Sequence, residues 1–123
     1  MTNLDRRFDT RIPFETYLTA YVDDRPTRGF TVNISETGLY LNTLPKTPNL
    51  PNKVVGLELA LPGVAETIWA AGKLCYGNDD DYFQGRGVRF TAMADRHARL
   101  VRQFCYRLRM QSARQRRAFA PSA

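Results

Sequence analysis

The sequence predicts a mostly β fold, a small six-stranded antiparallel barrel followed by a C-terminal α-helix. Between residues 14 and 90, apolar and polar residues alternate in six short segments with the two-residue period of a half-buried strand. Turn-forming residues separate these segments at the spacing typical of small barrels. After residue 94 the apolar period becomes helical. A chain of 123 residues suits one domain with its own core.

Turn-forming residues connect the six predicted strands, which span residues 14–22, 28–34, 38–42, 54–61, 67–76 and 82–90. Residues 23–26 (DDRP) predict a turn, and residues 77–81 (GNDDD) predict a hairpin loop. Three prolines predict a loop over residues 44–52. The alternation also predicts which side chains face the core, namely Phe30, Val32 and Ile34 in the second strand and Val55, Leu57, Leu59 and Leu61 in the fourth.

A single long helix is predicted from residue 94, because neither Pro nor Gly interrupts residues 92–117. Its apolar stripe consists of Leu100, Val101, Phe104, Cys105 and Leu108. We expect three parts in the chain: a flexible arm over residues 1–12, a barrel with its helix over residues 13–110, and a basic tail over residues 111–123 that is helical or frayed.

The net charge of +6 is unevenly distributed. Residues 95–123 contain eight arginines and one acid, whereas residues 1–94 are close to neutral. Fifteen of the 18 basic residues are arginines, whose planar fork binds phosphate and guanine edges bidentately and stacks on rings. The helical tail and the cluster Arg6, Arg7 and Arg11 are therefore the candidate sites for anionic ligands.

Several functional classes are disfavoured by the sequence. No uncharged stretch is long enough to span a membrane, and the start has no apolar signal-peptide region, so we expect a cytoplasmic protein. Cys75 and Cys105 form no metal-ligand pattern and are expected to be reduced core thiols. No paired-carboxylate, nucleophile-elbow or P-loop pattern is present, so we expect neither an enzyme nor a metal or cofactor site.

The first candidate motif is RxxxR, formed by Arg7 and Arg11 with Arg6 directly before it. It precedes the first predicted strand in a segment with little apolar content, which we expect to be mobile when empty. Taken alone, the motif is also what a solvated arginine-rich terminus looks like.

The second candidate motif is NxSxxG, formed by Asn33, Ser35 and Gly38 between the second and third predicted strands. A tight turn is the alternative interpretation, with Asn and Ser capping backbone groups and Gly at a positive φ. The same residues also suit a polar ligand, because an amide and a hydroxyl project where a glycine permits close approach.

Together, RxxxR before the first strand and NxSxxG between the second and third resemble the PilZ domain family, whose members are bacterial receptors for cyclic di-GMP. The sequence GRGVRF at residues 85–90 is also similar to the closing strand of that family, and the resemblance extends over residues 6–108. It implies a PilZ-type barrel in which Arg7, Arg11, Asn33, Ser35 and Gly38 bind cyclic di-GMP. Guanidinium groups can bind guanine O6/N7 or phosphate, and the amide and hydroxyl can bind guanine edges.

Arg6 extends the expected site. In the family, an arginine directly before RxxxR accompanies two intercalated ligand molecules in place of one, which suits an extra cation over a stacked guanine. The alternative is a solvated side chain.

The remaining polar residues are weaker candidates. Asp79, Asp80 and Asp81 are expected at a solvated hairpin tip, because Ca²⁺ needs more converging oxygens. His97 is expected at the surface or a boundary, with no Ser, Cys or carboxylate partner implied by the sequence. Trp69 is either a surface aromatic residue or lies under the helix.

The resemblance implies a non-enzymatic cyclic di-GMP receptor whose arm becomes ordered on binding, as in a disorder-to-order switch. Because RxxxR begins at residue 7, we expect no upstream output domain, so the signal would pass to a protein partner controlling motility, pili or polysaccharide. The alternative is a basic nucleic-acid-binding or adaptor module that works through the arginine-rich helix. Binding of nucleic acid is the less favoured of these two.

Overall fold

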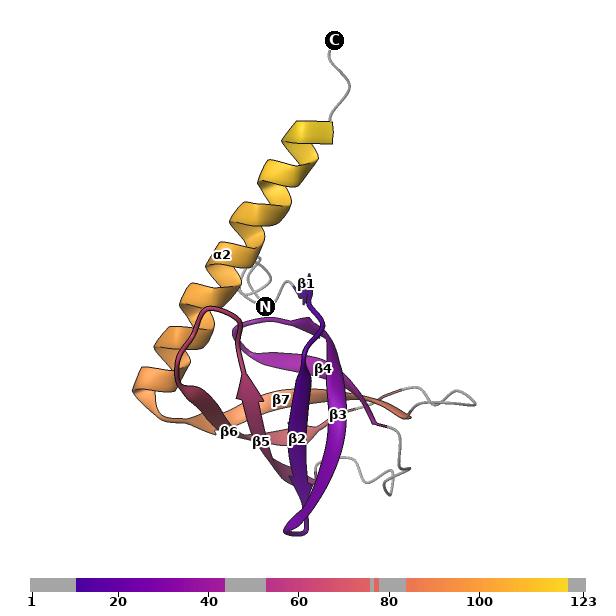
Figure 1. The fold of residues 1–123 in the computed structure, drawn as a ribbon. Helices are drawn as coiled ribbons and strands as arrows, with labels where there is room; N and C mark the ends of the chain where they lie inside the picture. Colours follow the sequence, from indigo (N-terminus) through magenta and orange to yellow (C-terminus); the bar gives the residue numbers. More distant parts are fainter. Residues whose placement is uncertain (1–10, 44–52, 76, 78–83, 120–123) are drawn as a thin grey trace, which may run out of the picture.

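The computed structural model describes residues 11–43, 53–75, 77 and 84–119. These residues form a closed six-stranded antiparallel barrel with a short additional strand and a C-terminal helix (Figure 1), which confirms the predicted fold class. The elements are β1 (Ile12–Pro13), β2 (Tyr17–Val22), β3 (Arg25–Ile34), β4 (Gly38–Thr43), β5 (Val54–Ala60), β6 (Thr67–Leu74), β7 (Gln84–Met93) and α2 (Asp95–Phe119).

The sheet has the strand order β1-β3-β2-β5-β6-β7-β4, and pairing of β3 with β4 closes the barrel. All pairs are antiparallel. Ile12, the last residue of the expected arm, pairs with β3 in β1 and is buried. The loop predicted over residues 44–52 and the aspartates Asp79, Asp80 and Asp81 lie outside the described residues.

The turn between β2 and β3 occurs where the sequence predicted it. Asp23 and Asp24 both have positive φ angles, 52° and 63°. Two consecutive residues of this kind fit the right-handed twist of a tight hairpin, and aspartate tolerates this region better than most residues. Arg25 and Pro26, which were expected in the turn, are already part of β3.

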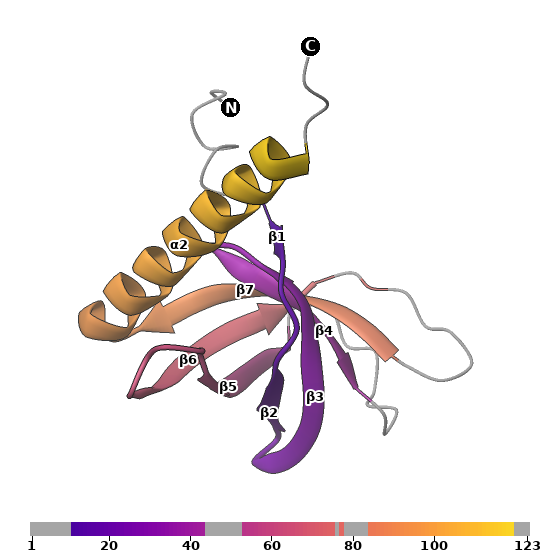
Figure 2. The ribbon, with the colours of Figure 1, turned by 45° about the horizontal axis from the view of Figure 1, so that its top comes forward.

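The core lies inside the barrel and under the first half of the helix. The clean alternation of the fourth predicted strand is confirmed, since Val55, Leu57, Leu59 and Leu61 are all buried. Helix α2 lies across one end of the barrel (Figure 2). Three residues of its stripe are buried in the core, namely Val101, Phe104 and Cys105. Burying these apolar side chains is the main favourable term in folding, at about 25 cal/mol per Å².

The predicted core face of β3 is wrong around Val32. Thr31 is fully buried and Val32 is 37% exposed, whereas Ile34 is fully buried as expected. The pairing of β3 with β4 shifts register between Thr31 and Asn33, so that Val32 is an extra residue in β3. Such a bulge reverses the inward parity of the strand, and it lies directly before the NxSxxG motif.

The two cysteines differ in environment. Cys105 is fully buried, as expected of a core thiol, but Cys75 is exposed just after β6, so the sequence expectation was wrong for Cys75. Both thiols are free. Among the described residues, no helix is long and apolar enough to cross a membrane.

Candidate functional site

The fold brings the end of RxxxR beside the start of NxSxxG. Arg11 directly precedes β1, whose Pro13 pairs with Asn33 at the end of β3. The Arg11 guanidinium Nη1 donates a hydrogen bond to Asn33 Oδ1 at 3.3 Å, across 22 residues of sequence. Arg11 is exposed and Asn33 is half-buried, so both side chains are accessible to a ligand. Arg6 and Arg7 lie outside the described residues.

Backbone and side-chain bonds fix the segment that follows Arg11 to β3. The Thr31 hydroxyl donates to the carbonyl oxygen of Phe14 at 2.6 Å and accepts from the amide of Thr16 at 2.9 Å. The amide of Phe14 donates to the carbonyl of Val32 at 3.0 Å. The bulge that turns Thr31 inward therefore makes its hydroxyl the anchor of the chain that leads out of RxxxR.

The turn between β3 and β4 is held together by Ser35. Its amide donates to the carbonyl of Gly38 at 2.8 Å, and its hydroxyl accepts from the amide of Thr37 at 3.2 Å. Ser35 is fully buried. This supports the tight-turn interpretation for Ser35, since its hydroxyl already bonds to groups of the turn.

Gly38 is required by the neighbouring strand. A Cβ atom at this position would lie 2.2 Å from the carbonyl oxygen of Val88, because β4 pairs there with β7. Its φ angle is not among the positive ones of the described residues, so left-handed backbone does not explain the glycine. Close approach of two strands explains it.

The helix contacts the NxSxxG turn through an ion pair that sequence reasoning missed. Arg109 Nη1 lies 3.1 Å from Glu36 Oε1, and both side chains are mostly buried. Nε and Nη2 of Arg109 are also buried and have no hydrogen-bond partner in the described part of the chain. The pKa of the nearby Cys105 thiol is raised to about 11, mainly by burial; Arg109 lowers this pKa and Glu36 raises it.

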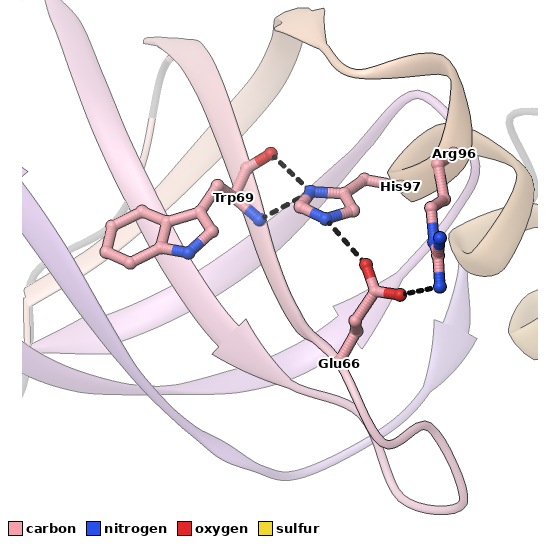
Figure 3. Close-up of polar contacts among 4 residues, drawn as sticks. All are labelled: Glu66, Trp69, Arg96 and His97. Atoms are coloured by element: carbon pink, nitrogen blue, oxygen red, sulfur yellow. Dashed lines mark hydrogen bonds and ion pairs between the residues drawn. The ribbon is translucent and has the colours of Figure 1, made fainter.

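A second contact fixes the start of the helix to the barrel wall (Figure 3). His97 Nδ1 lies 3.1 Å from the amide nitrogen of Trp69 and 3.4 Å from its carbonyl oxygen. When Nδ1 accepts from the amide, the proton of a neutral ring is on Nε2. Nε2 lies 3.2 Å from Glu66 Oε2, and Arg96 pairs with the other oxygen of Glu66. The sequence implied no carboxylate partner for His97, and this was wrong because the β5–β6 turn brings Glu66 to the helix.

The ring of Trp69 lies on the outside of the barrel. It is half exposed and stacks on Tyr21 with a centroid distance of 6.2 Å. This resolves the two positions left open for Trp69 in favour of a surface aromatic residue. The hydroxyl of Tyr21 donates to Glu58 at 2.8 Å, and this bond raises the pKa of Tyr21.

The described part of the chain contains no group of three or more His, Cys, Asp or Glu side chains placed to hold a metal ion. At the rim of the barrel, the described residues place the Arg11 guanidinium beside the Asn33 side-chain amide, next to the turn held by Ser35. Guanidinium and amide groups bind planar polar edges and phosphate oxygens. The fold and this rim therefore define a small barrel whose edge carries groups able to bind a planar or anionic ligand.

The sequence matches the PilZ domain over residues 5–107, and the chain belongs to the PilZ domain family. PilZ domains bind cyclic di-GMP as signalling modules. No curated protein sequence matches the chain at a significant level.

Two of the solved structures that resemble the fold illustrate the likeness. One is the Bacillus subtilis inhibitor of motility MotI/DgrA, with a TM-score of 0.70, 14% identity, and coverage of 83% of this chain and 51% of that one. The other is K. pneumonia MrkH in its apo state, with a TM-score of 0.65, 17% identity, and coverage of 86% and 52%. The chain spans about half the length of each, and at these identities the likeness concerns the fold.

Proposed function

We propose that the protein is a non-enzymatic receptor for cyclic di-GMP that binds the ligand at the junction of RxxxR and NxSxxG. The observation that carries this proposal is the hydrogen bond from Arg11 to Asn33, which joins the two motifs at an accessible rim. Membership of the PilZ domain family supports the choice of ligand.

In this proposal, Arg7 and Arg11 bind guanine edges or phosphates, and the amide of Asn33 binds a guanine edge. Arg11 exchanges its contact with Asn33 for contacts with the ligand, which leaves the amide oxygen free to accept from guanine. Ser35 and Gly38 complete the site by fixing the turn, since Ser35 is buried and Gly38 lies against β7. Arg6 binds a second, intercalated ligand molecule.

We further propose that binding orders the part of the expected arm that precedes Arg11 and so changes the surface offered to a protein partner. Control of motility, pili or polysaccharide is the expectation from the family. The name of MotI/DgrA, an inhibitor of motility, agrees with the first of these. Cytoplasmic location is part of the same proposal, because two free cysteines suit a reducing compartment.

Isothermal titration of cyclic di-GMP into the wild-type protein tests the receptor proposal. We expect Arg7→Ala and Arg11→Ala each to weaken binding at least about tenfold, since hydrogen bonds to charged groups contribute roughly 1.5–3 kcal/mol. Arg28→Ala is the matched control, because Arg28 is an exposed arginine of β3 whose guanidinium lies over Tyr17 on the outer wall. No heat of binding to the wild-type protein, or equal loss in all three variants, would contradict the proposal.

The same titration tests the role of Arg6. We expect two ligand molecules per wild-type chain and one per chain in Arg6→Ala. A stoichiometry of one in both proteins would contradict the second ligand and leave the receptor proposal intact.

A further inference from the structure

A groove lies between the β5–β6 turn and α2, and none of its lining residues belongs to the candidate ligand site. Its volume is about 760 Å³. Val64 of the turn and Leu100 of the helix are half-buried in its lining, and Tyr106 adds an aromatic ring that is 62% exposed. The groove is therefore apolar in its depth and open to solvent.

The rim of the groove is positively charged. Arg96, Arg102 and Arg107 line it together with a single carboxylate, that of Glu66. Glu66 already pairs with both Arg96 and His97. Arg102 and Arg107 have no ion pair with any described residue, so their charges remain available to a partner.

The dimensions indicate what could occupy the groove. Arg96 and Arg107 are eleven residues apart on one helix, which corresponds to about 16 Å along its axis. An extended peptide rises about 3.3 Å per residue, so roughly five residues span this distance. An occupant of this length would place apolar side chains on Val64 and Leu100 and carboxylates beside the arginines.

We propose that this groove is a docking site for a short acidic segment of a partner protein that also carries apolar side chains. Charge complementarity to Arg102 and Arg107 calls for the acidic residues, and the aliphatic depth calls for the apolar ones. The phosphates of a nucleic acid would match the arginines but leave Val64 and Leu100 without an apolar partner. The proposal does not depend on binding of cyclic di-GMP, since the groove shares none of the residues assigned to that site.

The test uses three blocked synthetic peptides: EELFEE, EESSEE with the same charge, and KKLFKK with the same apolar pair. Amide chemical shifts of the ¹⁵N-labelled full chain report the position of binding, and fluorescence polarisation reports the affinity. We expect EELFEE to shift the signals of Val64 and Leu100. EESSEE should bind at least about tenfold more weakly, because it has no apolar side chains to bury in the groove. KKLFKK should not bind.

Charge-reversal variants locate the site on the helix. Arg102→Glu combined with Arg107→Glu should weaken binding of EELFEE about tenfold, as expected for two solvent-exposed charge contacts. Arg114→Glu is the matched control, since Arg114 is exposed on the same helix but does not line the groove, and its effect should stay below about twofold. The circular dichroism spectrum of each variant checks that the helix is intact.

Four results would overturn the proposal. Equal binding of EELFEE and EESSEE, or equal weakening by Arg114→Glu, would reduce the groove to unspecific attraction of anions. An oligo-dT probe that shifts Val64 and Leu100 more strongly than EELFEE would assign the groove to nucleic acid. Concentration-dependent shifts of these signals without peptide would assign it to a second copy of the chain. Loss of cyclic di-GMP binding has no bearing on any of these results.

Discussion

The ion pair between Glu36 and Arg109 should stabilise the fold by a measurable coupling energy. The two side chains are 17% and 30% exposed, and their charged atoms are 3.1 Å apart. Exposed ion pairs contribute roughly 0.2–1 kcal/mol, whereas hydrogen bonds to charged groups in protected positions contribute about 1.5–3 kcal/mol. This pair lies between these cases, so we expect a coupling energy of about 1–2 kcal/mol.

The two single substitutions should differ in size. Glu36→Ala leaves the Arg109 guanidinium without a counter-charge while its Nε and Nη2 remain buried. Arg109→Ala removes those buried donors together with the charge, so part of the loss is offset. We therefore expect Glu36→Ala to lower the free energy of unfolding by about 2–3 kcal/mol and Arg109→Ala by about 1 kcal/mol.

Urea unfolding of the wild type, both single variants and the double variant gives the coupling energy from a double-mutant cycle. The pair of Lys53 and Asp23 provides the control cycle, with Lys53→Met and Asp23→Asn, because Asp23 is 66% exposed. Asparagine also tolerates the positive φ at that position. A coupling for Glu36 and Arg109 no larger than in this control, or a greater loss in Arg109→Ala than in Glu36→Ala, would refute the reasoning.

Three further substitutions test the site and the core. Gly38→Ala should lower the free energy of unfolding by roughly 2 kcal/mol or more, because the added Cβ would lie 2.2 Å from the carbonyl oxygen of Val88. Gly56→Ala is the control, since a Cβ there would have its nearest neighbour at 3.6 Å, and it should change the free energy of unfolding by less than about 1 kcal/mol. Urea titration measures both. Thr31→Val removes a hydroxyl that makes two hydrogen bonds, so it should lower the free energy of unfolding by about 1–3 kcal/mol and with it the melting temperature. An unchanged melting temperature would show that the Thr31 hydroxyl is not needed to hold the segment after Arg11. The pKa of Cys105 is about 11 in the folded protein and about 9 in the unfolded chain, so the unfolded chain loses the thiol proton first as the pH rises. The free energy of unfolding should therefore be unaffected by this group below pH 9 and fall by about 2 kcal/mol between pH 9 and 11. Cys105→Ala should lack this fall.

Alternation predicted the barrel well where strands pair regularly. The fourth predicted strand places the four alternating apolar side chains from Val55 to Leu61 inside, as its sequence indicates. In β3 the same reasoning fails, because one extra residue at Val32 shifts the register and reverses the inward face. Nothing in the apolar pattern marks this residue, since Phe30, Val32 and Ile34 alternate without interruption. The bulge depends on how β3 pairs with β4, and the alternation of residues within β3 carries no information about that pairing.

The motifs were visible in the sequence, but the contacts that support them were not. RxxxR and NxSxxG can be read directly, and the structure brings Arg11 to Asn33. Glu36 occupies a variable position of the second motif, and its partner Arg109 is 73 residues away. To predict an ion pair between residues so far apart in the sequence, one must know how the helix crosses the barrel, and the apolar periodicity of the helix does not determine this. The contact of His97 with Glu66 was missed for the same reason.

Barrel closure also affects how the protein folds. Among the strand pairs of the barrel, β4 and β7 join the most distant residues, since Gly38 pairs with Arg89, 51 positions later in the sequence. Contacts between distant residues require the entropy of a large loop to be lost before they form, and folds dominated by such contacts fold in milliseconds to seconds. Because the NxSxxG turn leads directly into β4, we expect the turn to reach its final geometry only when β4 has paired with β7. We expect the candidate site to be completed only after the β2–β3 and β5–β6 hairpins have formed.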